Sequence, residues 1–401
     1  MVAQTLRASV LIISIFCGFI LMWDVEAQSQ IQDRTDVYFV AVGSQHHLDK
    51  RFYTNNVPAD APNYSAEFVS DMLMAHGARD GILVVSDEGH FVGREDIEKA
   101  LIDIKHIIRK DNSEHPLIFF YYMGHGLGDQ YNNLLYLPPG NLRFHGGFNQ
   151  TYMVKLLKSA MSNYDIICSL VMFRNHFSMA HWDSVFASDL ILDMSDPVDM
   201  MQTMELQMRL NDIDSVNRNE GNYLPGGNPA VPFVVLFDNC YGDIVQNLTG
   251  SDDAKGGYQE GMQQTVLSPM QDIILQEFAE LQTEGLVLYA VKPGMEVRDY
   301  TDPSSEGYRI GALAWRLYFA FQEQDGQDSM TLAALRRAME KTYPDKNDKG
   351  YANPSVPFEL SPPRAEILQV GIPLQVSPSH SSNRFEKRLG TATSGVMCCE
   401  P

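Results

Sequence analysis

The sequence has few basic residues for its length. Lys and Arg number 30 against 51 Asp and Glu, so the formal net charge is -21. An acidic surface repels nucleic acid and anionic membranes and favours basic ligands. We therefore expect no nucleic-acid partner.

Cysteine is also scarce, with five residues in a chain of 401. There is no Cys-x-x-Cys pair and no Cys/His spacing of the zinc type, so we predict no metal site from these residues. Cys17 lies in the N-terminal apolar segment. The other four (Cys168, Cys240, Cys398 and Cys399) allow three disulfide pairings, among which the sequence does not choose. A disulfide between Cys168 and Cys240 therefore stays open.

The chain lacks an N-terminal apolar run long enough to span a membrane, which takes about 20 residues. Arg7 precedes an apolar stretch of 16 residues, Ala8–Trp23, and Val25-Glu26-Ala27 forms a small-x-small cleavage pattern before Gln28. We predict a signal peptide over residues 1–27. The mature protein would then be secreted or periplasmic and free of the membrane, whereas an uncleaved segment would anchor it to the membrane.

Apolar and aromatic runs alternate with amphipathic stretches through most of the chain. Predicted strands are Val37–Ser44, Gly81–Ser86, Leu117–Met123, Asn133–Gly140, Ile166–Phe173, Val231–Cys240 and Gly285–Gly294. Predicted helices are Ser65–His76, Arg94–Lys110, Thr151–Met161, Met194–Leu210, Gln271–Gln282, Gly311–Gln322 and Met330–Thr342. Apolar strands separated by amphipathic helices predict an α/β fold with a mostly parallel central sheet that helices cover on both faces.

We expect one large domain over residues 28–372. Residues 165–230 interrupt the pattern of the core and are predicted to be an insertion. Residues 247–264 are polar and rich in glycine, which is typical of a flexible loop. Residues 373–401 are rich in serine and are predicted to be a disordered tail.

Two of the predicted strands end at a reactive side chain. PLIFFYYMGHG (Pro116–Gly126) ends in a histidine between two glycines, and VPFVVLFDNC (Val231–Cys240) ends in a cysteine. Ligands bind beyond the carboxyl ends of parallel strands, where both residues would lie. His125 can take the thiol proton of Cys240 and later protonate a leaving amine. The backbone N–H groups of Gly126 and Cys240 are the predicted oxyanion hole.

These two stretches resemble motifs of the caspases and metacaspases. YYMGHG resembles the motif of the general-base histidine, and LFDNCYG resembles the Asp-x-Cys motif of the nucleophile. The resemblance implies a caspase-like three-layer sandwich and a cysteine endopeptidase that acts on protein or peptide substrates. It also assigns Asp238 to a substrate pocket for Arg or Lys.

The chain departs from the metacaspase pattern at two places. The family has the motif Asp-Ser-Cys-His-Ser-Gly at the nucleophile, whereas this chain has Asp-Asn-Cys-Tyr-Gly over residues 238–242. The family also has Asn-Asp-Ala at its first helix, and the stretch Asn63–Ala66 lacks that aspartate. Half of the expected acidic pocket is therefore missing. An inert caspase-fold scaffold is the alternative to an enzyme, and a legumain-like relative is a third possibility.

Three further features have a simpler explanation beside the functional one. Lys255 is the only basic residue between Tyr241 and Val291 and is a candidate autoprocessing site, or an ordinary loop lysine. Asp252-Asp253 could bind calcium, but a solvated acidic loop explains the pair as well, and we expect no other cofactor. His46-His47 could bind a metal, but adjacent side chains point in different directions in a strand, so we expect no such site.

Overall fold

The fold is described here from a computed structural model. The structure describes residues 35–48, 61–87, 89–129, 134–142, 156, 159–171, 231–240, 242–243, 278–293, 295, 300–304, 308–324, 326–341 and 356–374. The predicted signal peptide (1–27), the helix Met194–Leu210, the loop 247–264 and most of the predicted tail lie outside these ranges, as does most of Thr151–Met161.

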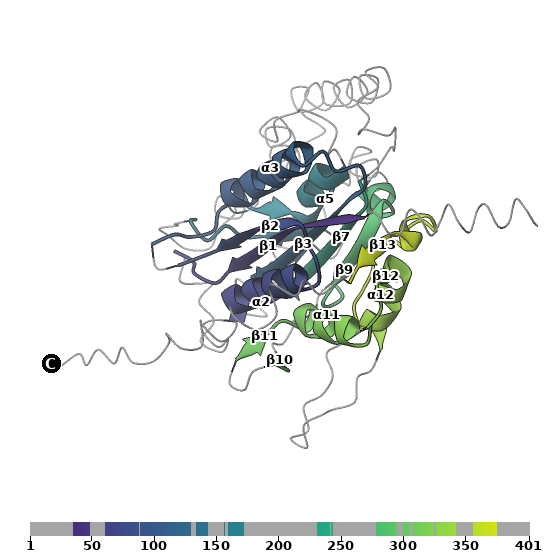
Figure 1. The fold of residues 1–401 in the computed structure, drawn as a ribbon. Coiled ribbons are helices and arrows are strands. Elements are labelled where there is room, and N and C mark those ends of the chain that lie inside the picture. Colours follow the sequence, from purple (N-terminus) through teal and green to yellow (C-terminus); the bar gives the residue numbers. More distant parts are fainter. Residues whose placement is uncertain are drawn as a thin grey trace, which may run out of the picture.

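The centre of the protein is a parallel sheet of five strands in the order β2-β1-β3-β7-β9 (Figure 1). The strands are β1 (Asp36–Ser44), β2 (Asp80–Val85), β3 (Pro116–Gly124), β7 (Phe233–Asn239) and β9 (Gly285–Tyr289). The predicted α/β class with a mostly parallel sheet is therefore confirmed. β3 and β7 are direct neighbours, although more than a hundred residues separate them in the chain.

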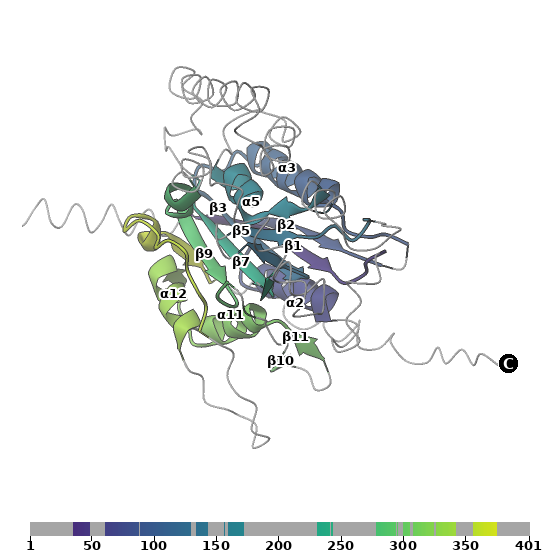
Figure 2. The ribbon, with the colours of Figure 1, turned by 180° about the vertical axis from the view of Figure 1, so that it is seen from behind.

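Helices cover both faces of this sheet. One face carries α3 (Arg94–Lys110) and α5 (Asn163–Val171), and the other carries α2 (Ala61–Ala75), α11 (Ala312–Gln322) and α12 (Leu332–Glu340) (Figures 1 and 2). Side chains of a strand alternate between these faces. On β3, Phe120 packs in the core beneath α3 and α5, whereas Phe119 and Tyr121 pack in the core beneath α2 and α11.

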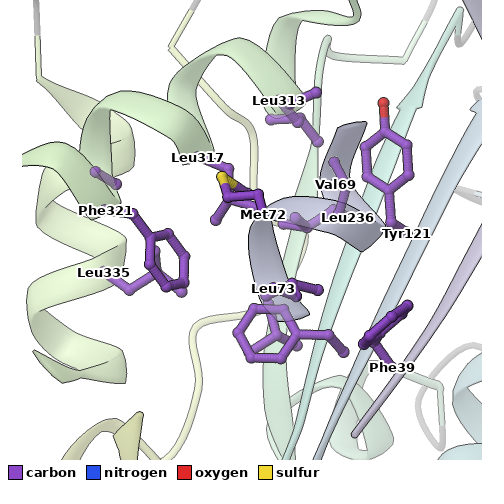
Figure 3. Close-up of a cluster of buried hydrophobic side chains, with 14 of the residues drawn as sticks. Phe39, Val69, Met72, Leu73, Tyr121, Leu236, Leu313, Leu317, Phe321 and Leu335 are labelled. Atoms are coloured by element: carbon purple, nitrogen blue, oxygen red, sulfur yellow. The ribbon is translucent and has the colours of Figure 1, made fainter. Parts of the chain in front are cut away.

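The core beneath α2, α11 and α12 joins elements from both ends of the chain. Figure 3 shows Phe39 and Leu236 of the sheet together with Met72 of α2, Leu317 of α11 and Leu335 of α12. All five are buried. The C-terminal third of the described chain is thus packed onto the same sheet as the N-terminal third.

Three small sheets flank the central one. β4 (Leu127–Asp129), β5 (Leu134–Leu137), β6 (Met161–Ser162) and β8 (Gly242–Asp243) form a sheet in the order β6-β5-β4-β8. Two antiparallel pairs are β10 (Tyr300–Thr301) with β11 (Arg309–Ile310), and β12 (Ser329–Thr331) with β13 (Gly371–Pro373). A short 3-10 helix, η2 (Ile367–Gln369), precedes β13.

Two predicted strands differ from the structure. Ile166–Phe173 is not a strand, because Asn163–Val171 forms α5. Ser162 and Asp165 form a reciprocal cap at its start: Ser162 N–H donates to Asp165 Oδ2 (2.8 Å) and Asp165 N–H donates to Ser162 Oγ (3.1 Å), which favours a helix. The second difference is β2: the sequence predicts strands covered by helices on both faces, but β2 is an edge strand whose Leu83 is 38% exposed.

No helix among the described residues combines the length and the apolar character needed to cross a membrane. The N-terminal apolar segment Ala8–Trp23 lies outside the described residues.

Candidate active site

The carboxyl ends of three neighbouring strands meet at one edge of the central sheet. Ser44 at the end of β1 is the register partner of Gly124 at the end of β3, and Gly124 is in turn the partner of Asn239 at the end of β7. His125 and Cys240 are the next residues after β3 and β7. Parallel strands therefore deliver both predicted catalytic residues to the same edge.

The two neighbouring segments of the chain pair again directly after His125 and Cys240. β4 pairs in parallel with β8, with Leu127 opposite Gly242. The register offset is the same before and after the gap: 239 − 124 = 115 and 242 − 127 = 115, which equals 240 − 125. His125 and Cys240 thus lie at equivalent positions of two neighbouring parallel segments. Parallel strands are spaced about 4.8 Å apart.

The backbone of His125 is tied to its own strand. Tyr122 Oη donates a hydrogen bond to the carbonyl oxygen of His125 at 3.2 Å, and the Tyr122 side chain is buried. Burial raises the pKa of Tyr122, so this hydroxyl keeps its proton and remains a donor. A Cβ at Gly124 would lie 2.7 Å from Tyr122 Oη and 2.9 Å from the Ser44 carbonyl oxygen, so glycine leaves room for the Tyr122 hydroxyl at this position.

The backbone of Cys240 is held by the residue that precedes it. Asn239 Nδ2 donates to the carbonyl oxygen of Cys240 at 3.0 Å, and Asn239 is buried. A Cβ at Gly126 would lie 1.8 Å from Asn239 Nδ2 and 2.1 Å from the Cys240 carbonyl oxygen. Glycine at position 126 thus lets the histidine loop pack directly against the cysteine loop, which brings together the two residues of the predicted oxyanion hole.

Neither Cys240 nor Cys168 forms a disulfide in this structure. The disulfide between them that the sequence left open is therefore absent from this structure. Cys168 is buried in α5 within the core beneath α3, whereas Cys240 is partly exposed at the edge of the sheet. Thiol chemistry at Cys240 is thus not blocked by Cys168.

Asp238 lies beneath the end of β7 with 0% of its surface exposed. Its Oδ2 accepts hydrogen bonds from the backbone N–H groups of Leu313 (2.9 Å) and Ala314 (3.0 Å) at the start of α11, and from Tyr121 Oη (3.0 Å). Burial raises the pKa of the Asp238 carboxyl to about 6, although these donors act in the opposite direction. Its Oδ1 forms no hydrogen bond within the described part of the chain.

Ser65 of α2 lies at the start of the same helix α11, to which Asp238 is bound. Ser65 Oγ donates to the carbonyl oxygen of Ala61 (2.6 Å) and accepts the backbone N–H of Gly311 (3.0 Å), the residue just before α11. Tyr121 interacts with both Asp238 and Ser65, and all three residues are buried, so in this structure they form a closed polar cluster. Whether Asp238 binds substrate stays a prediction; its observed contacts cap α11.

Sequence reasoning missed a second histidine at the site. The ring of His47 meets the ring of His125 in a T-shaped contact, with centroids 5.1 Å apart and an interplanar angle of 68°. His47 is buried, in the loop after β1. The signal that could have identified it was its place directly after the strand that neighbours β3, rather than its pairing with His46.

The other predicted sites lie elsewhere or outside the described residues. Lys255 and the Asp252-Asp253 pair lie outside them, so autoprocessing and calcium binding stay predictions. Within the described ranges, no group of three or more His, Cys, Asp or Glu side chains is arranged to hold a metal ion.

No protein-family model matches the chain, and no curated protein matches it. A solved structure to which it is similar is the protein GSU0716 from Geobacter sulfurreducens, with 11% sequence identity and a TM-score of 0.39. The similarity covers 83% of this chain and 96% of that one, and at this TM-score it carries no conclusion about fold or function.

Proposed function

We propose that this protein is an exported cysteine endopeptidase of caspase-like fold, in which Cys240 is the nucleophile and His125 is the general base. The observation that carries the proposal is the constant register offset of 115 residues on either side of the His125/Cys240 pair. Adjacent strands with that register bring a histidine and a cysteine to equivalent positions at a sheet edge, which is where ligands bind in parallel sheets.

The arrangement suits acyl transfer. His125 takes the thiol proton, and the Cys240 thiolate attacks the carbonyl carbon of the scissile peptide bond. The oxyanion is stabilised by the backbone N–H groups of Gly126 and Cys240. His125 then gives its proton to the departing amine, which leaves a thioester on Cys240. Water, deprotonated by His125, hydrolyses this thioester and returns the free thiol.

We further infer a preference for Arg or Lys before the cut bond. A buried carboxylate oxygen without a donor is costly, and a cationic substrate group would supply one to Asp238 Oδ1. Because the cluster of Ser65, Tyr121 and Asp238 is closed here, substrate entry requires Ser65 and the start of α11 to separate from Asp238.

A panel of fluorogenic peptides with Arg, Lys, Asp or Asn before the reporter group tests activity and preference together. We expect hydrolysis of the Arg and Lys peptides, and its loss in both Cys240→Ala and His125→Ala. Cleavage after Asp or Asn alone would contradict the role of Asp238 but leave the dyad intact. A folded chain that cleaves no peptide under reducing conditions would instead favour an inert caspase-fold binding module.

A further inference from the structure

A third side chain lies against the candidate dyad, from a third strand end. The central sheet has the order β1-β3-β7 at this point, so His125, after β3, lies between the loop after β1 and Cys240 after β7. His47 belongs to that first loop and touches the His125 ring. The nucleophile and His47 therefore flank the base on opposite sides.

The contact between the two imidazole rings is directional. A centroid distance of 5.1 Å and an interplanar angle of 68° correspond to an edge-to-face arrangement, which aromatic rings prefer over a parallel stack. The His47 ring is only 4% exposed, whereas His125 is partly exposed. A buried ring packed at this angle restricts rotation of the more exposed ring against it.

The loop that carries His47 is itself fixed by several hydrogen bonds. Ser86 Oγ, after β2, accepts the backbone N–H groups of both Gln45 and His46 at 2.9 Å. Asn63 Nδ2, at the start of α2, donates to the Ser86 carbonyl oxygen at 2.5 Å. The Nε2 atom of His47 lies 3.5 Å from Ser44 Oγ. The His47 ring is thus held by elements that do not include the dyad.

We propose that His47 is a positioning residue for the catalytic base: it holds the His125 ring in the orientation that faces Cys240. This inference rests on the proposed function, because it assigns His47 a role only if His125 acts on Cys240. A base held in place by a third group is the arrangement that activates nucleophiles in many hydrolases. Here the third group acts through ring packing, so it does not exchange a proton with His125.

The test uses the full chain and two readouts. The first is the rate at which iodoacetamide alkylates Cys240 at pH 6 relative to pH 9, read by mass spectrometry of the Cys240 peptide so that Cys168 does not contribute. The second is kcat and KM for the best peptide of the panel. The variants are His47→Ala, His47→Gln, His47→Phe and His125→Ala. His106→Ala, an exposed histidine on α3, is the matched control.

We expect His47→Ala and His47→Gln to lower kcat about tenfold or more, with KM nearly unchanged, because a misoriented base slows the chemical step and leaves binding intact. Alkylation at pH 6 should fall toward the rate of His125→Ala. His47→Phe keeps a flat ring without nitrogen atoms, so it should retain kcat within about threefold of the wild type. His106→Ala should match the wild type.

Two results would overturn the inference alone. His47→Gln with wild-type kcat and alkylation would show that His47 does not position the base. His47→Phe as impaired as His47→Gln would show that a nitrogen atom of the ring, and not its packing, is required. If the wild type is alkylated at pH 6 no faster than His125→Ala, the dyad itself fails, and the role of His47 fails with it. His47→Gln and His47→Phe keep the test decisive if His47→Ala does not fold.

Discussion

Three uncharged residues, Tyr122, Gly126 and Asn239, hold the backbone around His125 and Cys240. Tyr122 and Asn239 each donate to one carbonyl oxygen of the pair, and Gly126 lets the two loops touch. Because all three residues are neutral, they hold the two loops in place without adding a charge beside His125 and Cys240. Such preorganised backbone geometry is what an oxyanion hole requires, because its donors must already point to the place where charge develops.

Gly126→Ala should separate these loops. A methyl group at this position would overlap Asn239 Nδ2 and the Cys240 carbonyl oxygen. We expect a loss of about 1–3 kcal/mol in the free energy of unfolding from overpacking, and a fall on the order of 100-fold in kcat/KM. Gly89→Ala is the control, since a Cβ there meets only Asp87 Oδ1 at an ordinary 3.5 Å. Full activity in Gly126→Ala would refute this account of the loop contact.

Asp238→Asn should remove a pH dependence of stability. Burial raises the folded-state pKa of Asp238 from an ordinary 3.8 to about 6, so the stability it contributes is present below about pH 4 and is lost as the pH rises through 6. The free energy of unfolding should fall by roughly 3 kcal/mol over this pH range, because the folded and ordinary pKa values differ by about two units. Urea unfolding at pH 4, 5, 6 and 7 measures it. The variant should lack this fall, whereas Glu114→Gln, an exposed control, should keep it.

The helix α11 is joined both to the candidate site and to α12. Its first turn donates to Asp238 below the end of β7. Its Arg316 is buried and donates from Nη1 to the carbonyl oxygens of Met339 (2.6 Å) and Lys341 (2.7 Å), at the end of α12. The last carbonyl groups of a helix have no partner within it, so Arg316 caps α12 from the side.

Arg316→Ala should therefore destabilise the packing of α12. The change removes the donor from the buried carbonyl oxygen of Met339 and the part-buried carbonyl oxygen of Lys341, and it opens a cavity in place of a side chain that is only 1% exposed. We expect the free energy of unfolding to fall by about 3 kcal/mol in a denaturant titration. Arg337→Ala, exposed on α12, should change it by less than about 0.5 kcal/mol. Equal effects of the two variants would contradict the capping role.

The elements with strong periodicity were predictable from the sequence. The predicted bounds of α3 match the structure, because buried side chains such as Ile97, Leu101 and Ile104 recur at helical spacing. Ile166–Phe173 was assigned wrongly because a short apolar run fits a strand and a buried helix equally well. The cap formed by Ser162 and Asp165 favours the helix. This cap lies just before the apolar run, so the run by itself does not reveal it.

At the scale of the whole molecule, the central sheet is assembled from two distant parts of the chain. β1, β2 and β3 come from residues 36–124, and β7 and β9 come from residues 233–289. The second part pairs with the first along β3, and α11 returns to the end of β7. β7 and β9 pair with each other and β7 pairs with β3, so the strand pairs of the central sheet do not depend on the peptide bonds that connect β8 to β9.

A cut within residues 247–264, where Lys255 lies, should leave the two fragments associated. β7 precedes the cut and β9 follows it, yet the two pair from Phe233 to Phe237, and Ala290 N–H donates to the Phe237 carbonyl oxygen at 3.0 Å. A recognition sequence for an added protease, placed in this stretch, tests this independently of the activity of the protein. We expect two bands on a denaturing gel and one peak in gel filtration. Separation of the fragments would show that the pairing across β7 and β9 does not hold them.

The positions of His125 and Cys240 at one sheet edge were predictable, because each follows an apolar run. Their alignment at one register offset was not, because pairing between residues 115 apart is a tertiary property. His47 was missed for the same reason: its partner is His125, and no local pattern links the loop after β1 to the loop after β3. The burial of Asp238 was also hidden, since it depends on the approach of α11.

The most direct test of the dyad is where, and how fast, a thiol-reactive peptide probe attaches to the folded protein under reducing conditions. A peptidyl vinyl sulfone with Arg at its reactive end serves, with the modified residue located by mass spectrometry. We predict one adduct, on Cys240, and a rate on the order of 100-fold lower in His125→Ala. An adduct on Cys240 that forms equally fast in His125→Ala, or no adduct on Cys240 in the folded wild type, would contradict the account.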